Sequence, residues 1–178
     1  MKQRKIFLTG VFTVMLAMGG CMAGMAAQET ETETEKEEWK APEGFESPQE
    51  AAEAFGDAYI EEDAYRIVTL FAEETINYMA DNNEPGSADP RETMLSVWQA
   101  SFDAGDTGLE SFEITECRDL TEEEFRNHFE HYATEPEDAA RVTVSFPPCT
   151  DVSGVLYPDG LDYYCFTGCF DGFWYLVM

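Results

Sequence analysis

The spacing of the apolar residues changes near Gly108, and this change limits the folds open to the chain. Before it, apolar residues recur at helical spacing, as at Phe55, Ala58 and Tyr59. After it, they alternate with polar residues, as in the segment 140–146, "ARVTVSF". Helices followed by strands predict an α+β domain, with the helices packed on one face of an antiparallel sheet.

Four start signals predict where the helices begin. "SPQE" at 47–50 supplies an N-cap serine, a proline for the first helical position and a glutamate for the reciprocal cap. Asp63 is expected to cap a second helix that has Ala64, Ile67, Val68 and Phe71 on one side. "DPRE" at 89–92 repeats the first signal, and "TEEE" at 121–124 predicts a short helix between strands.

Three further patterns predict strands. The segment 109–120, "LESFEITECRDL", alternates and is expected to form a strand before the one at 140–146. The runs 161–170 and 173–178 are rich in β-forming residues, and Asp171-Gly172 between them favours a tight hairpin turn.

The first 20 residues have the pattern of an export signal. Three basic residues lie within the first five positions, and an apolar stretch follows over 6–20. Bacterial lipoprotein signals resemble this pattern and end in a cysteine after small residues, as Cys21 does here, although Met18 stands where leucine is usual. We therefore expect a lipoprotein signal peptide over 1–20 and acylation of Cys21.

Two other interpretations of this leader remain. Small residues at 23–27 suit an ordinary cleaved signal, and 6–27 is almost long enough for an uncleaved anchor. All three interpretations export the remainder of the chain. We expect an exported protein held on the outer face of the cell membrane by its lipid.

The segment after Cys21 is strongly acidic. Residues 28–46 read "QETETETEKEEWKAPEGFE", which offers too little apolar surface to offset the entropy of ordering. We predict a disordered acidic tether over 21–46, with a helical arm as the alternative, and a single domain over 47–178. Three of the 10 Lys+Arg residues but none of the 37 Asp+Glu residues lie in the leader, so the remainder carries a formal charge of −30. Such a surface repels nucleic acids and anionic lipids, and suits cations or basic partners.

Both ends of the predicted domain resemble a known superfamily. Residues 47–74, "SPQEAAEAFGDAYIEEDAYRIVTLFAEE", resemble the first two helices of small secreted domains of the nuclear transport factor 2-like superfamily, and "FDGFWYLV" at 170–177 resembles their final hairpin strand. The resemblance implies a cone, in which a curved antiparallel sheet wraps around the helices and a pocket opens at the mouth. Enzymes of the superfamily place an Asp or a His–Asp pair inside the cone, but no such pair can be mapped onto this sequence.

The cysteines predict disulfides. Cys117, Cys149, Cys165 and Cys169 fall in the strand-rich half, and an exported chain permits two disulfides in three connectivities. Cys165 and Cys169 are four residues apart on one predicted strand, about 13 Å, so we expect each to pair elsewhere unless Gly168 breaks the strand. Buried free thiols and a zinc site are the alternatives.

Two weaker patterns suggest metal sites. "DNNEPGSADPRE" at 81–92 approaches a calcium loop, although Pro85 offers no side-chain oxygen. A plain acidic loop is the alternative. His128 and His131 have a spacing that can hold a metal on one helical turn, yet solvated histidines explain them equally. The oxygen ligands of the calcium pattern are Asp81, Asn83, Asp89 and Glu92.

No catalytic residue is selected by the sequence. The chain has no GxSxG, HExxH, Walker or dinucleotide-binding motif. We therefore expect a non-catalytic module that binds a small ligand or a protein without a cofactor, with a homodimer through the sheet face as one possibility. The alternative is an isomerase- or lyase-type enzyme that uses a carboxylate in the cone pocket.

Overall fold

The computed structural model describes residues 39–40, 42, 44–84, 86–104, 109–150 and 156–178. Within these ranges no helix is long and apolar enough to cross a membrane. The helices are α2 (Pro48–Ile60), α3 (Ala64–Thr69), α4 (Glu73–Asn82), α5 (Pro90–Ala104) and α6 (Glu122–Phe129). The strands are β1 (Glu113–Asp119), β2 (Asp138–Phe146), β3 (Cys149–Thr150), β4 (Leu156–Tyr157), β5 (Leu161–Phe170) and β6 (Phe173–Val177).

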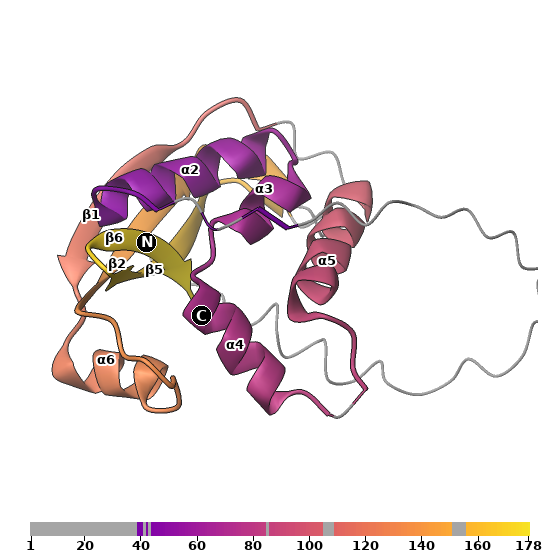
Figure 1. Ribbon diagram of the computed structural model, residues 1–178. Helices are drawn as coiled ribbons and strands as arrows, with labels where there is room; N and C mark the ends of the chain where they lie inside the picture. Colours follow the sequence, from indigo (N-terminus) through magenta and orange to yellow (C-terminus); the bar gives the residue numbers. More distant parts are fainter. Residues whose placement is uncertain (1–38, 41, 43, 85, 105–108, 151–155) are drawn as a thin grey trace, which may run out of the picture.

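Four strands form one antiparallel sheet in the order β1-β2-β5-β6. The two residues each of β3 and β4 pair separately. Helix α2 lies along one face of the sheet, and α6 lies on the opposite side (Figure 1). We call the face toward α2 the inner face and the other the outer face. The expected α+β class with an antiparallel sheet is confirmed, but the helices do not all share one face of the sheet, because α6 packs on the outer face.

Three helix starts expected from the sequence are confirmed by the hydrogen bonds of their capping residues. The Ser47 hydroxyl accepts a hydrogen bond from the Glu50 N–H at 3.2 Å, and Asp63 caps α3 by accepting from Arg66 N–H at 2.9 Å. Thr121 and Glu124 cap each other at the start of α6. These caps satisfy N–H groups that have no partner within the helix.

The second helix is shorter than the apolar pattern indicated. Helix α3 ends at Thr69, and Phe71 forms a parallel bridge with Leu176 of β6 before α4 begins. The Leu176 N–H donates to Leu70 O at 2.9 Å, and the Ala72 N–H donates to Leu176 O at 3.0 Å. The backbone therefore leaves the helix to pair with the edge of the sheet, a contact that local spacing does not encode.

The main core is aromatic and lies between α2 and the inner face. Tyr59 has no exposed surface, and its ring contacts those of Phe102 and Phe146 at centroid distances of 5.7 and 5.1 Å. Its hydroxyl lies 2.9 Å from the hydroxyl of Tyr163 on β5. Small residues on the same face of α2 let this helix approach the sheet closely; they are Ala51, Ala52, Ala54 and Ala58.

A second, smaller core lies under α6 on the outer face. Phe129, with no exposed surface, packs on Phe125 and Tyr132 at centroid distances of 5.0 and 5.2 Å. The Tyr132 hydroxyl lies 3.1 Å from that of Thr75 on α4 and donates to Met178 O at 3.0 Å. This tyrosine therefore joins the end of α6, helix α4 and the C-terminal residue.

The ordered domain begins before Ser47. Phe45 and Trp174 exchange two backbone hydrogen bonds of 3.0 and 2.9 Å, and Trp39 stacks on Tyr65 of α3 at 4.9 Å. The last part of the predicted tether over 21–46 thus packs on the domain, because its aromatic side chains can bury surface there. Residues 1–38, including the predicted signal over 1–20 and Cys21, lie outside the described residues.

Candidate functional site

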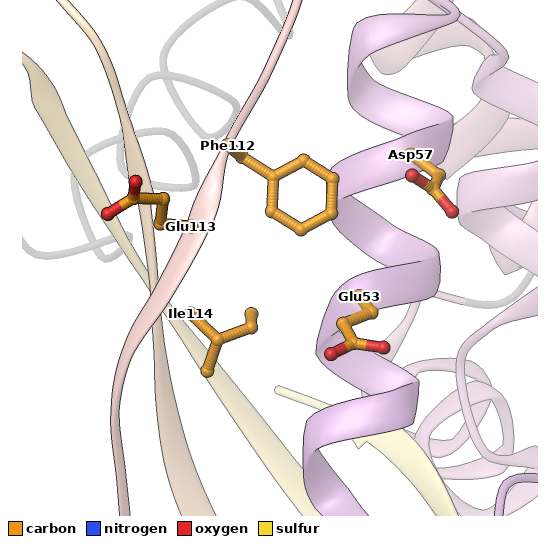
Figure 2. Close-up of a pocket in the computed structure, with 5 residues that line it drawn as sticks. All are labelled: Glu53, Asp57, Phe112, Glu113 and Ile114. Atoms are coloured by element: carbon orange, nitrogen blue, oxygen red, sulfur yellow. The ribbon is translucent and has the colours of Figure 1, made fainter.

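An open depression lies between α2 and the beginning of β1. Its volume is about 520 Å³. Figure 2 shows Phe112 and Ile114 extending toward α2, whose Glu53 and Asp57 carboxylates lie opposite. Glu113 also lines the depression, with its carboxylate turned to the other side of the strand in this view. An aromatic ring next to carboxylates combines the two features that attract an organic cation.

Gly56 explains how Phe112 reaches this position. A Cβ atom at Gly56 would lie 2.7 Å from the ring of Phe112, which is too close for the ring to keep its position. The ring also contacts that of Phe146 at 6.1 Å, so it joins the depression to the main core. The sequence did not point to this site. The available signal was the pair of acidic residues Glu53 and Asp57 on the side of α2 away from its apolar residues.

The charges on α2 are not balanced at the depression. Glu53 and Asp57 are four residues apart, so they are neighbours on one side of the helix and repel each other. Asp57 has a long ion pair with Arg66 at 4.0 Å, while that arginine also contacts Glu61 at 2.7 Å. A bound cation would relieve the repulsion between Glu53 and Asp57.

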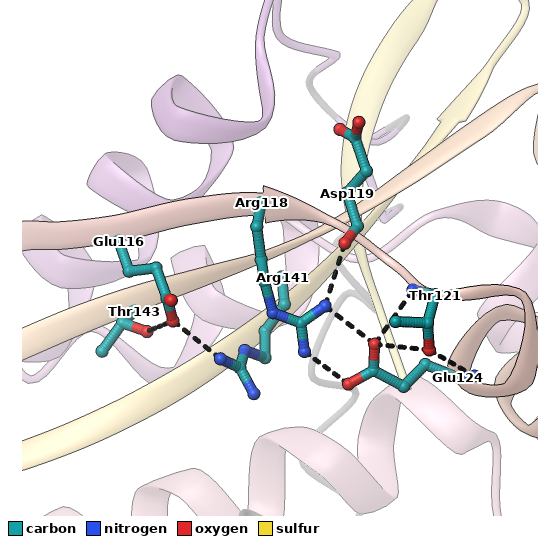
Figure 3. Close-up of polar contacts among 7 residues, drawn as sticks. All are labelled: Glu116, Arg118, Asp119, Thr121, Glu124, Arg141 and Thr143. Carbon is teal, nitrogen blue, oxygen red and sulfur yellow. Dashed lines mark hydrogen bonds and ion pairs between the residues drawn. The ribbon is translucent and has the colours of Figure 1, made fainter.

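The outer face of the sheet carries polar pairs instead of a bare apolar surface. Arg141 donates to Glu116 at 2.7 Å (Figure 3). Its guanidinium group also lies over the ring of Tyr164, 4.9 Å from the ring centroid. Arg118, directly opposite Arg141 in the register, makes two hydrogen bonds to Glu124 of α6. Each of the two facing guanidinium groups thus has its own carboxylate. A homodimer through this face stays a prediction.

The Arg118–Glu124 pair gives a pH-dependent contribution to stability. Hydrogen bonds from Arg118, and from Thr121 at the helix cap, lower the pKa of Glu124 from 4.5 to about 2. A carboxyl with a lower pKa in the folded state stabilises the fold above its unfolded pKa and loses this contribution as the pH falls toward the folded value.

We expect the free energy of unfolding to fall more steeply between pH 5 and pH 2 in the wild type than in Glu124→Gln. Urea titrations at several pH values measure this slope. Glu122→Gln is the matched control on the same helix, because its side chain is 91% exposed and its ion pair with Arg126 contributes little. Equal slopes for wild type and Glu124→Gln would contradict the role given to the Arg118 contact.

Two of the possible cysteine pairs are too far apart for a disulfide. Cys117 and Cys165 both face Val142, one from each side, so two strand spacings separate them by about 10 Å. Strand β5 continues through Gly168 and holds Cys165 and Cys169 about 13 Å apart. A disulfide needs Cα atoms within about 7 Å. These two pairs are therefore too far apart to be bridged, whereas a disulfide that includes Cys149, which is buried in β3, stays a prediction.

These thiols should differ in reactivity. Burial raises the pKa of Cys165 to about 12, so its thiolate is scarce at neutral pH, whereas Cys117 is exposed on β1. We expect an alkylating reagent at pH 8 to modify Cys117 in the native protein and Cys165 only after unfolding. Mass spectrometry of peptides, with and without denaturant, measures both. Alkylation of Cys165 ahead of Cys117, or protection of Cys117 that only a reductant removes, would contradict this arrangement.

The predicted metal ligands are spread over three elements. Asp81 lies in the last turn of α4, Asn83 is its C-cap and Glu92 lies in α5. Asp89 already accepts a hydrogen bond from Arg91 N–H at 2.8 Å. Across the described ranges, no group of three His, Cys, Asp or Glu side chains could hold a metal ion. Pro85 lies outside them, and the calcium loop stays a prediction.

His128 and His131 diverge on the structure. The ring of His128 lies 3.9 Å from that of Phe166 on the outer face, and burial there lowers its pKa. His131 contacts Glu130 at 3.2 Å and is exposed. The histidine pair therefore does not gather at one point, because α6 turns one ring onto the sheet.

The alternative enzymatic hypothesis requires a carboxylate in an apolar pocket. Within the described residues, the buried polar side chains are only Thr75, Thr143 and Thr167, and no Asp or Glu is among them.

Comparisons with protein-family models, with curated proteins and with solved structures gave no match. The proposal below therefore depends on the residues of this chain alone.

Proposed function

We propose that this chain is an exported, lipid-anchored module that binds a cationic partner at the depression between α2 and β1. The observation that carries the proposal is the position of Glu53 and Asp57, one helical turn apart, opposite the ring of Phe112. An ammonium or guanidinium group between them gains charge attraction and contact with an aromatic ring. The formal charge of −27 for the whole chain adds a long-range attraction for such partners.

The proposal includes the fold: we propose that the domain is a nuclear transport factor 2-like cone. The helix α2 on the inner face of an antiparallel sheet is compatible with that arrangement, and the depression would lie at the side of the cone. Its interior is filled by aromatic rings around Tyr59. A filled interior favours binding at the surface of the domain over chemistry inside it.

Binding is tested with spermidine, a small polyamine, by isothermal titration calorimetry at low and high salt. We expect Glu53→Gln/Asp57→Asn to bind at least about tenfold more weakly than the wild type, which corresponds to about 1.4 kcal/mol. Glu84→Gln/Glu123→Gln is the matched control, since it removes the same charge from exposed positions away from the depression. Equal losses in both variants would show that only net charge matters, and would refute a site at the depression.

The anchor is tested separately. Acylation of Cys21 would make this residue the first of the mature protein. The intact mass of protein extracted from membranes should correspond to a chain that begins at Cys21 and carries acyl groups. A mature form that lacks Cys21, or one that retains the leader over 1–20, would refute the lipid anchor.

A further inference from the structure

The rest of the chain closes one edge of the sheet. At β6, Trp174 exchanges two backbone hydrogen bonds with Phe45, and Leu176 is bonded to Leu70 and Ala72. The backbone groups that β6 turns away from β5 are therefore used within the domain at both positions. A closed edge cannot accept another strand.

The edge at β1 is different. The Leu120 N–H donates to Ala139 O at 3.1 Å, in register with the β1–β2 ladder. Because backbone groups alternate in direction along an antiparallel strand, those of Arg118 point toward β2 and those of Cys117 and Asp119 point away. The Asp119 carbonyl accepts from the Arg118 guanidinium at 2.9 Å. For the backbone of Cys117, the described ranges contain no outward partner, and its side chain is exposed.

The acidic side chains next to the β1 edge favour a basic partner. The only cation of β1 is Arg118, which is already bound to Glu124. A second copy of this chain, with its own charge of −27, would be repelled, whereas a basic segment would be attracted. On the side of the edge that faces α2, three carboxylates would neighbour the side chains of an added strand; they belong to Glu53, Asp57 and Asp119.

We propose that β1 takes up an extended basic segment of a partner protein as a fifth strand of the sheet. Backbone hydrogen bonds to Cys117 supply the register, and lysine or arginine side chains at alternate positions all point to the same side of the added strand, where they meet the carboxylates of α2 and of Asp119. This inference rests on the proposed function, because it specifies the cationic partner as an extended peptide that also covers the α2–β1 depression.

The test uses the full chain and an alternating lysine–valine octapeptide with blocked ends. Cys117→Pro removes the outward N–H, and proline is tolerated on an edge strand at such a position. Cys117→Ala is the matched control, since it changes the side chain and keeps the N–H. We expect Cys117→Pro to bind the octapeptide at least about tenfold more weakly than Cys117→Ala. In the wild type, bound peptide should slow hydrogen exchange at the N–H of Cys117.

A second arm keeps the test decisive should Cys117→Pro fail to fold. The same octapeptide, N-methylated at alternate residues so that one edge cannot form hydrogen bonds, retains its charge. Markedly weaker binding of the methylated peptide supports strand addition. Equal binding of both peptides overturns strand addition but leaves the proposed cation site intact. Binding of spermidine without binding of the octapeptide has the same meaning. Failure of every cationic probe refutes both proposals, and a dimer through β1 in sedimentation overturns this one.

Discussion

Replacing Tyr59 by alanine is expected to lower the free energy of unfolding by about 3–5 kcal/mol, the range for large aromatic residues in a packed core. Tyr59 is fully buried, and its ring contacts helices α2 and α5 and strands β2 and β5 through Phe55, Trp98, Phe146 and Tyr163. The truncation therefore leaves a cavity where four elements meet. Urea unfolding monitored by circular dichroism measures the loss.

Tyr59→Phe is the matched control for this substitution. It keeps the ring and removes the hydroxyl that lies within hydrogen-bond distance of the Tyr163 hydroxyl, so we expect a loss of about 1 kcal/mol. A Tyr59→Ala protein as stable as Tyr59→Phe would show that the ring does not organise the core. Spermidine binding by the folded fraction of Tyr59→Phe should be unchanged, because Tyr59 does not line the depression.

Phe129→Ala is expected to cost about 3–5 kcal/mol and to act first on the second core. Phe129 has no exposed surface and packs on Tyr132, which holds Thr75 and the backbone of Met178. Its loss should free α6 and the C-terminal residue before the main core opens. Hydrogen exchange of α6 amides, together with urea unfolding, measures both effects.

Phe125→Ala on the same helix is the control, since Phe125 is only half-buried and should cost less. Equal destabilisation by both substitutions would argue against Phe129 as the centre of this core. Uniform faster exchange over α2 and α6 in Phe129→Ala would show that the two cores unfold together.

Local signals in the sequence determined much of the secondary structure. The caps at Ser47, Asp63 and Thr121 fixed three helix starts, because the bonds that satisfy a helix terminus come from residues three positions away. The alternation over 140–146 identified β2, since one side of this strand is buried against α2. The turn at Asp171-Gly172 has positive φ values at both residues, as the sequence indicated.

The break between α3 and α4 could not be read from the sequence. It depends on pairing between Phe71 and Leu176, which are distant in the chain. The spacing of the cysteines also left their pairing open, because strand order decides that Val142 lies between Cys117 and Cys165. Periodicity describes which side of an element is buried, but not which element covers it.

The candidate site also depends partly on local sequence and partly on tertiary contacts. The amino-acid sequence by itself determined the charge of the chain and the export-like leader, because each depends on composition or on neighbours along the chain. Only the tertiary structure brought Phe112 against Gly56 next to Glu53 and Asp57, and paired the outer edge of β6 with Phe45, Leu70 and Ala72. Contacts between segments far apart in the sequence are set by packing of the whole core, which no local pattern contains.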